Sequence, residues 1–177
     1  MPFLIVNADG DEIPNPKAIA EFQPGKTWHD KVIAQPMVFE MDMWHYNCNW
    51  KNKQTWLKGA ILPGGPTLEG TYSLQDHRAD PVAKRAPRLP NGGWHLSFFL
   101  SVDEMIRKLE SFAHQEFNRP QYKSREHLMD CIQNGKDLFF RTWSSTQLIP
   151  HQDQIATTLP VELQEFHQEM MKHQGVV

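Results

Sequence analysis

The stretch Phe3-Leu4-Ile5-Val6-Asn7-Ala8-Asp9-Gly10-Asp11-Glu12-Ile13-Pro14-Asn15-Pro16 decides how the rest of the chain is interpreted. Its apolar start, bounded by Asn, Gly and Pro, is typical of a buried strand. If the strand continued to Asp9 and Asp11, both side chains would face the same way, because alternate residues share a side. Neighbouring carboxylates repel unless a cation lies between them, and Mg²⁺ or Mn²⁺ prefers such oxygen ligands. An ordinary Asp- and Gly-containing turn explains these residues equally well.

Length and composition indicate one soluble domain. The 177 residues fit a single domain, taken as 1–177 with a helical tail over about 150–177. The net charge of −3 argues against nucleic acid as a partner. No apolar run approaches the roughly 20 residues of a membrane helix, and the first residues do not resemble a signal peptide, so we expect a cytoplasmic protein. Cys48 and Cys131 are expected to be reduced.

The segments after the first strand predict alternating short elements. Asn15 is a suitable N-cap and Pro16 a suitable first residue for a helix that ends near Phe22. The next expected elements are strands over 37–47 and 56–62, which form an antiparallel pair around a polar turn at 49–53. A loop is expected at 63–66, followed by a helix within Leu68–His77 that Gly70 weakens.

A basic, proline-bearing stretch follows from Arg78 to Pro90. It is either a solvated loop or a flexible cover over an anionic ligand. Gly92 and Gly93 then permit a close backbone approach before a strand that runs to Leu100. Helices are expected from a capping box at Ser101 and Glu104 to about 112–114, from Ser124 to Asn134 with Gly135 as a stop, and over Leu159–His173, with a short strand at 136–141.

Several motifs occur in the order found in a known enzyme family. The segments are D-G-D-E-I-P-N-P (9–16), H-Y-N-C-N-W-K (45–51), G-G-W-H-L-S-F (92–98), S-F-A-H-Q-E-F-N (111–118) and N-G-K-D-L-F (134–139), with a weaker Q-D-H-R (75–78). Together they resemble glycosyltransferase family 17, which includes the β-1,4-mannosyl-glycoprotein β-1,4-N-acetylglucosaminyltransferase. The resemblance covers about residues 3 to 141.

The resemblance implies a fold and a reaction. It implies an α/β, partial GT-A-like mixed sheet with flanking helices, and an inverting transferase that uses a divalent cation, Mn²⁺ or Mg²⁺. The donor would be UDP-GlcNAc and the acceptor a hydroxyl of a mannose-type N-glycan. In the family, strand–helix units that bind the uridine precede the D-x-D motif, whereas eight residues precede Asp9 here. A partner chain or a second copy in a homo-oligomer would then supply those units, or the chain would recognise the donor differently.

Inverting transfer needs a neutralised leaving group, a base and aligned sugars. With the family in view, Asp9 and Asp11 are the expected metal ligands. Arg78, with one of Lys84, Arg85 and Arg88, is expected at the diphosphate. Trp94 and Trp50 are candidates for stacking on the nucleotide sugar or the acceptor, although a core position is equally plausible for Trp50.

Two further residues are assigned to catalysis. His95 follows Gly-Gly-Trp and is expected to bind the metal or a phosphate, although lone histidines are more often structural. Glu116 is the expected base, with Asp76 and Glu69 in reserve; its alternative role is that of a helix-end residue that accepts backbone hydrogen bonds.

Two other functional classes account for parts of the sequence. The first is a non-catalytic, glycosyltransferase-like binding or structural module, or one half of a split transferase completed by a partner. The second is a phosphoesterase with two His-x-Ser/Thr elements, because His95-Leu96-Ser97 supplies one. His45 is followed by Tyr-Asn and His127 by Leu-Met, so the second element is missing and we set this class aside.

Overall fold

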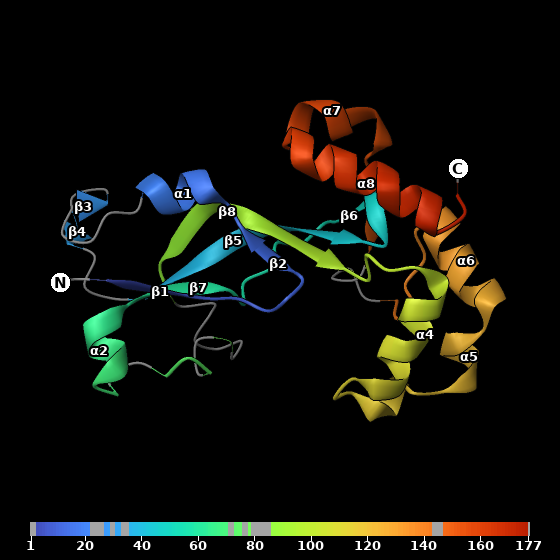
Figure 1. The fold of residues 1–177 in the computed structure, drawn as a ribbon, viewed down its shortest axis with the longest axis horizontal. Helices are drawn as coiled ribbons and strands as arrows, with labels where there is room; N and C mark the ends of the chain where they lie inside the picture. Colours follow the sequence, from blue (N-terminus) through green and yellow to red (C-terminus); the bar gives the residue numbers. More distant parts are fainter. Residues whose placement is uncertain are drawn as a thin grey trace. The chain divides into compact units, whose positions relative to one another are not determined.

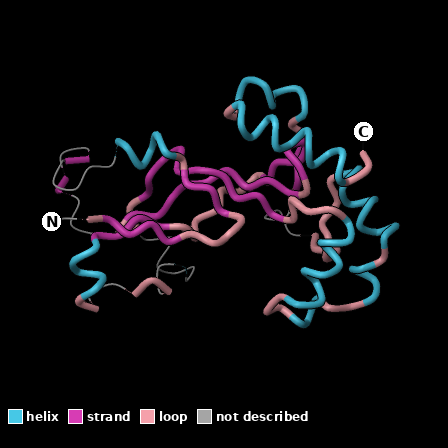
Figure 2. The backbone as a smooth tube through the Cα atoms, in the orientation of Figure 1, coloured by secondary structure: helices cyan, strands magenta, loops and turns pink. Residues whose placement is uncertain are grey.

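The computed structural model describes residues 3–21, 27–28, 31–32, 36–70, 73–75, 78, 86–142 and 147–176. Helices and antiparallel strands occur together, which confirms the α/β class in general (Figures 1 and 2). The chain forms two compact units. Unit 1 comprises Met1–Asp42 and Thr55–His95, and unit 2 comprises Met43–Gln54 and Leu96–Val177.

Unit 1 is built on strands. They are β1 (Leu4–Asn7), β2 (Glu12–Pro14), β3 (Thr27–Trp28), β4 (Lys31–Val32), β7 (Ala60–Pro63) and the first parts of β5 (Met37–His45) and β8 (Arg88–Ser97). The strand β7 lies between β1 and β5 and is antiparallel to both, with Val6 opposite Ile61 and Met37 opposite the same residue. The short strands β3 and β4 pair only with each other among the described strands.

The strand β8 explains the paired glycines. It pairs with both β2 and β5. A Cβ atom on Gly92 would lie 2.8 Å from the Phe39 Cα atom, and one on Gly93 would lie 2.1 Å from the Ile13 carbonyl oxygen. Gly93 also has a φ of +144°, which side chains disfavour. Each glycine therefore permits one neighbouring strand to approach, and together they set Glu12 opposite His95 in the β2–β8 pair.

Two α-helices fall within the described residues of unit 1. They are α1 (Pro16–Glu21) and α2 (Gly64–Leu68). The expected start of α1 is confirmed, because the Asn15 Oδ1 atom accepts a hydrogen bond of 3.1 Å from the Lys17 amide. The buried face of α1 places Ala18 in an apolar cluster with core residues of β5, β7 and β8. That cluster consists of Ala18, Met37, Phe39, Met41, Ile61 and Leu89, with Leu4, Ile19 and Trp56 beside it.

Most of the helices that the structure describes lie in unit 2 (Figure 1). Its strands are β6 (Asn47–Asn52) and β9 (Leu148–Pro150), and β6 pairs antiparallel with the end of β5 and with β9. Its helices are α4 (Val102–Ser111), the 3-10 helix η2 (Gln115–Phe117), α5 (Pro120–Lys123), α6 (Arg125–Asn134), the 3-10 helix η4 (Gln152–Gln154), α7 (Ile155–Thr158) and α8 (Val161–His173). The long helix α8 packs on β6.

The helix ends of unit 2 confirm the local signals in the sequence. Ser101 and Glu104 form the reciprocal capping box at the start of α4, which satisfies two amides that a helix start leaves open. The Ser124 hydroxyl accepts a 3.2 Å bond from the His127 amide at the start of α6. Gly135 ends α6 in the left-handed conformation, with φ of 61°.

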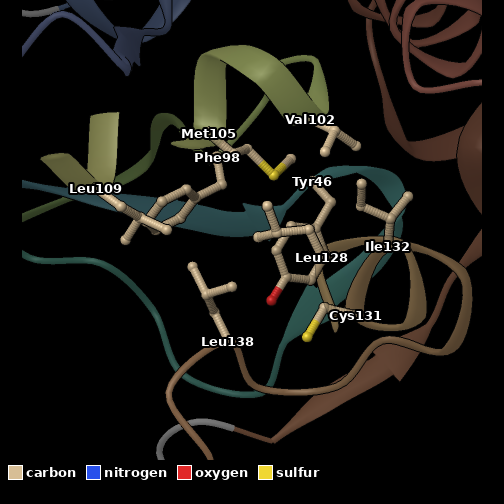
Figure 3. Packing of buried hydrophobic residues seen from close by; sticks show 9 residues of the cluster. All are labelled: Tyr46, Phe98, Val102, Met105, Leu109, Leu128, Cys131, Ile132 and Leu138. Carbon is tan, nitrogen blue, oxygen red and sulfur yellow. The ribbon is translucent and has the colours of Figure 1, made fainter. Parts of the chain in front are cut away.

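The core of unit 2 lies between α4, α6 and the chain around Tyr46 (Figure 3). It consists of Tyr46, Phe98, Val102, Met105, Leu109, Leu128, Cys131, Ile132 and Leu138. The Tyr46 hydroxyl donates a 2.8 Å bond to the Lys136 carbonyl oxygen, so this buried polar atom is satisfied. Burial raises the pKa of the Cys131 thiol to about 12, and burial likewise raises the pKa of Cys48 to about 12. Both are free, as expected.

Three expected elements differ from the structure. Residues 49–53 belong largely to β6 instead of a polar turn, because pairing with β5 and β9 outweighs the weak strand preference of Asn and Lys. The loop at 63–66 becomes the start of α2, where Pro66 falls in the first turn that tolerates proline. The strand at 136–141 is a turn, because the Asp137 carboxylate accepts from the Phe139 and Arg141 amides.

Other expectations fall partly outside the described residues. The helix expected within Leu68–His77 is absent from the described residues 69–70 and 73–75, and α2 ends at Leu68. Residues 71–72 and 76–77 lie outside the described residues. Most of the basic stretch, 79–85, also lies outside the described residues. None of the helices in the described part of the chain combines the length and apolarity needed to cross a membrane.

We expect Gly93→Ala to destabilise the protein by about 3 kcal/mol, since a new Cβ atom would clash with the Ile13 carbonyl and strain the backbone. Urea unfolding followed by circular dichroism measures this loss. Gly65→Ala is the matched control, because nothing lies within 4 Å of its Cβ position in α2. Equal stability of the two variants would contradict the steric explanation for Gly93.

Candidate functional site

The two aspartates of the opening stretch lie on a tight turn in unit 1. The Glu12 amide donates a 3.0 Å bond to the Asp9 carbonyl oxygen, so the chain reverses between β1 and β2. Strand geometry therefore does not continue to Asp11, and of the two interpretations left open by the sequence the turn is the one that forms. The Asp9 side chain is 61% exposed and that of Asp11 33% exposed, which leaves both carboxylates open to solvent.

Glu12 is the residue around which this turn is built, and the sequence analysis assigned it no role. Its side chain is fully buried. It accepts hydrogen bonds from the Trp56 Nε1 atom at 2.6 Å, the Arg78 Nη2 atom at 2.7 Å and the Asp9 amide at 3.0 Å. Burial raises the pKa of Glu12, but the bonds from Arg78, Trp56 and the Asp9 amide outweigh burial, so its pKa lies below its ordinary value.

Arg78 links the buried carboxylate to the exposed one. Its guanidinium contacts the Asp9 Oδ2 atom and both Glu12 carboxylate oxygens. The pKa of Arg78 lies above its ordinary value, mainly because of the hydrogen bonds to Glu12. An exposed pair such as Arg78–Asp9 contributes about 0 to 1 kcal/mol to stability. Removing one partner of a fully buried pair costs about 3 to 5 kcal/mol. The cost is smaller here because the Arg78 side chain is 21% exposed, but Glu12 is still the stronger anchor of this guanidinium.

The segment from Trp56 to Gly59 surrounds this pair of charges. The Lys58 Nζ atom donates a 2.7 Å bond to the Arg78 carbonyl oxygen, and Arg78 Nη1 lies 3.3 Å from the Lys58 carbonyl oxygen. A Cβ atom on Gly59 would lie 3.1 Å from the Glu12 Oε2 atom. The backbone of this segment therefore holds Arg78 and leaves room for Glu12.

His95 places an imidazole beside Asp11. It is 5% exposed and stacks on Trp56, with ring centroids 4.1 Å apart and planes inclined by 12°. Its Nε2 atom lies 3.5 Å from the Asp11 Oδ1 atom. Its Nδ1 atom is buried, and no described group hydrogen-bonds it, which is unusual for a buried polar atom.

The donors at this turn suit a hard divalent cation. Carboxylate oxygens are the preferred ligands of Mg²⁺ and Mn²⁺, and a cation that also binds substrate phosphates needs only one or two of them. Asp9 and Asp11 provide two carboxylates on one turn, with His95 beside Asp11. Among the described residues no three His, Cys, Asp or Glu side chains are already arranged as a closed metal cage.

The remaining predicted residues of unit 1 lie apart from this group or are not described. Trp94 is half-buried and pairs with Ile13; adjacent strand residues project to opposite faces, so it faces away from the side of β8 that carries His95. Arg88 forms a 3.3 Å exposed pair with Glu40. Glu69 is exposed at the end of α2. Asp76, Lys84 and Arg85 lie outside the described residues.

Trp50 and Glu116 belong to unit 2. The Trp50 Nε1 atom donates a 2.7 Å bond to the Ile132 carbonyl oxygen, and its ring fills the space beside Gly135. Glu116 lies on η2, is exposed and pairs with the His114 Nδ1 atom at 2.9 Å. The hydrogen bond from its own amide, and then that from His114, lower the pKa of Glu116. The catalytic and sugar-binding roles of these two residues stay predictions.

The structure thus brings together Asp9, Asp11, Arg78 and His95, and it adds Glu12 and Trp56, which the sequence analysis missed. Glu12 directly follows the D-x-D motif, and that position was the available signal for it. Nothing in the sequence around Trp56 marked it, because its contacts with Glu12 and His95 span 44 and 39 residues.

Comparisons of the chain with protein-family models, curated proteins and solved structures give no match. The glycosyltransferase resemblance therefore rests on the motifs alone.

We expect Glu12→Gln to lower the free energy of unfolding by about 1 to 3 kcal/mol at pH 7, because Arg78 loses its buried counter-charge. The pKa of Glu12 is lowered in the folded protein, so its stabilisation is present above the pKa of the unfolded chain and disappears as the pH falls through the folded pKa. The difference between wild type and variant should narrow between pH 5 and pH 3.

Urea unfolding at several pH values measures this difference. Glu165→Gln is the control, because Glu165 is an exposed residue of α8. If the difference in free energy of unfolding between wild type and Glu12→Gln stayed constant down to pH 3, the ionised Glu12 carboxylate would not be the cause of that difference.

Proposed function

We propose that this chain is a metal-dependent, inverting glycosyltransferase with a partial GT-A-like sheet, and that the Asp9–Glu12 turn binds the cation and the diphosphate of a nucleotide sugar. The observation that carries the proposal is the meeting, at one turn, of two solvent-accessible carboxylates, an arginine and a buried histidine. The family resemblance adds UDP-GlcNAc as the donor and a hydroxyl of a mannose-type glycan as the acceptor.

Each group at the turn has a task in this proposal. Asp9 and Asp11 would hold the cation, which supplies Lewis-acid neutralisation of the leaving diphosphate. Arg78 places a permanent positive charge beside them, and Arg is well suited to phosphate oxygens. His95 lies next to Asp11 and is positioned by the Trp56 ring, so it orients that carboxylate or donates to a phosphate oxygen.

The proton of the acceptor hydroxyl must pass to a base, for which Glu116 stays the prediction. Its exposure and its lowered pKa make it a weaker base than a carboxylate tuned toward neutral pH. The exposure of Glu116 and its lowered pKa favour a second candidate. That candidate is a donor-binding module without transfer activity, or one half of a split transferase that a partner chain or second copy completes.

We expect Asp9→Asn and Asp11→Asn each to weaken Mn²⁺-dependent UDP binding at least 10-fold, because each removes a charged oxygen ligand. Isothermal titration calorimetry with UDP, with and without Mn²⁺, measures the effect. Asp103→Asn is the matched control: Asp103 is 63% exposed and pairs with Arg125, much as Asp9 is 61% exposed and pairs with Arg78. Unchanged UDP affinity in both turn variants would rule out the metal assignment.

A transfer assay separates the enzyme from the binding module. Wild type with Mn²⁺, UDP-GlcNAc and a mannose-terminated glycan should release UDP and form product, and Glu116→Gln should lower turnover about 100-fold or more while it retains donor affinity. Near-normal turnover of Glu116→Gln would exclude it as the base. Donor binding by wild type without transfer or donor hydrolysis would favour the binding module.

A further inference from the structure

The Arg78 guanidinium compensates the negative charge of the Asp9 carboxylate, which a cation bound to Asp9 would also do. It contacts the exposed carboxylate of Asp9 and the buried carboxylate of Glu12 at the same time. The turn therefore already has a positive partner before any metal binds. The cation and the guanidinium are both attracted by the negative charge of Asp9.

We propose that Glu12 is a positioning residue that holds Arg78 as an exchangeable counter-charge of Asp9, so that the divalent cation and the guanidinium compete for Asp9 and a diphosphate relieves the competition. This inference rests on the proposed function for the identity of the ligands. Arg78 opposes binding of the cation alone and favours binding of the cation together with a diphosphate.

The geometry makes one of the two contacts of Arg78 easy to exchange and the other difficult. The Asp9 carboxylate is mostly exposed, so water or a metal ion readily replaces the guanidinium there. The Glu12 carboxylate is fully buried and receives both Nη atoms, so its separation from Arg78 would leave an uncompensated charge. The reciprocal contacts between Arg78 and Lys58 also keep the backbone of Arg78 near the turn.

An arginine that leaves Asp9 without leaving Glu12 presents one free N–H of its Nη2 atom beside the turn, because the other N–H stays bonded to Glu12. A diphosphate oxygen is a strong acceptor for that group. A diphosphate that draws the guanidinium away from Asp9 therefore strengthens cation binding there, and by linkage the cation strengthens diphosphate binding by the same factor. Without diphosphate, the cation must displace Arg78 with no compensating contact.

The test begins with Mn²⁺ alone. Arg78→Gln removes the competitor, so we expect it to bind Mn²⁺ about 3- to 10-fold more tightly than wild type, as followed by calorimetry or by the electron paramagnetic resonance signal of free Mn²⁺. Glu12→Gln removes the second carboxylate that attracts Arg78. Arg78 then pairs with Asp9 alone, so this variant should bind Mn²⁺ more weakly than wild type. A purely structural role of either residue predicts weaker binding for both. Arg125→Gln, which removes the partner of Asp103, is the control and should change nothing.

The second measurement compares Mn²⁺ affinity with and without UDP. Wild type should bind Mn²⁺ at least 5-fold more tightly in the presence of saturating UDP, after correction for the Mn²⁺–UDP complex in solution, and Arg78→Gln should lose most of this factor. This wild-type comparison keeps the proposal testable if Arg78→Gln does not fold.

The two proposals fail in different ways. Unchanged or weaker binding of Mn²⁺ to folded Arg78→Gln, or the absence of coupling in a wild type that binds both ligands, would overturn the competition and leave the transferase proposal in place. Conversely, tighter Mn²⁺ binding by Arg78→Gln in a protein that does not bind UDP would support the competition at Asp9 and reject the nucleotide-sugar function.

Discussion

A carboxylate that loses all contact with water must have its charge compensated by the protein, and Glu12 imposes this requirement on unit 1. Its compensation comes from three separate segments: the amide of Asp9 in its own turn, the indole of Trp56 and the guanidinium of Arg78. These segments have to converge for Glu12 to stay ionised. The same convergence brings the Asp9 side chain to Arg78 and the Trp56 ring to His95, so the candidate site follows from the needs of one buried charge.

Signals that act within a few residues were readable in the sequence. The N-caps at Asn15, Ser101 and Ser124 and the left-handed Gly135 fall where the pattern placed them, because each depends on a side chain and an amide within the same turn. The alternation of bulky and polar residues after Met37 predicted β5 for a similar reason. Local physical chemistry determines these features, and tertiary contacts only reinforce them.

Features that depend on distant partners were missed or misplaced. Trp56 gave no sign that it would bond to Glu12, 44 residues away. The polar segment at Asn49–Lys53 looked like a turn until its place between β5 and β9 was known. The D-x-D aspartates left a strand and a turn equally open, and the bond from the Glu12 amide to Asp9 makes a turn there. The motif was thus a better guide to which residues gather than to the backbone that presents them.

The paired glycines of β8 show how missing side chains determine the alignment of the site. Gly92 has no Cβ atom where β5 approaches, and Gly93 has none where β2 approaches. Each neighbouring strand can therefore pack closely against β8 at the glycine position only. A slip of β8 by a single residue would bring Trp94 against a backbone that leaves no room for any Cβ atom. It would also turn His95 to the opposite face of the sheet, away from Asp11. The close packing of Gly92 and Gly93 against the neighbouring strands therefore fixes the register of β8. Because His95 lies two residues after Gly93, this register also places its imidazole next to the Asp11 carboxylate.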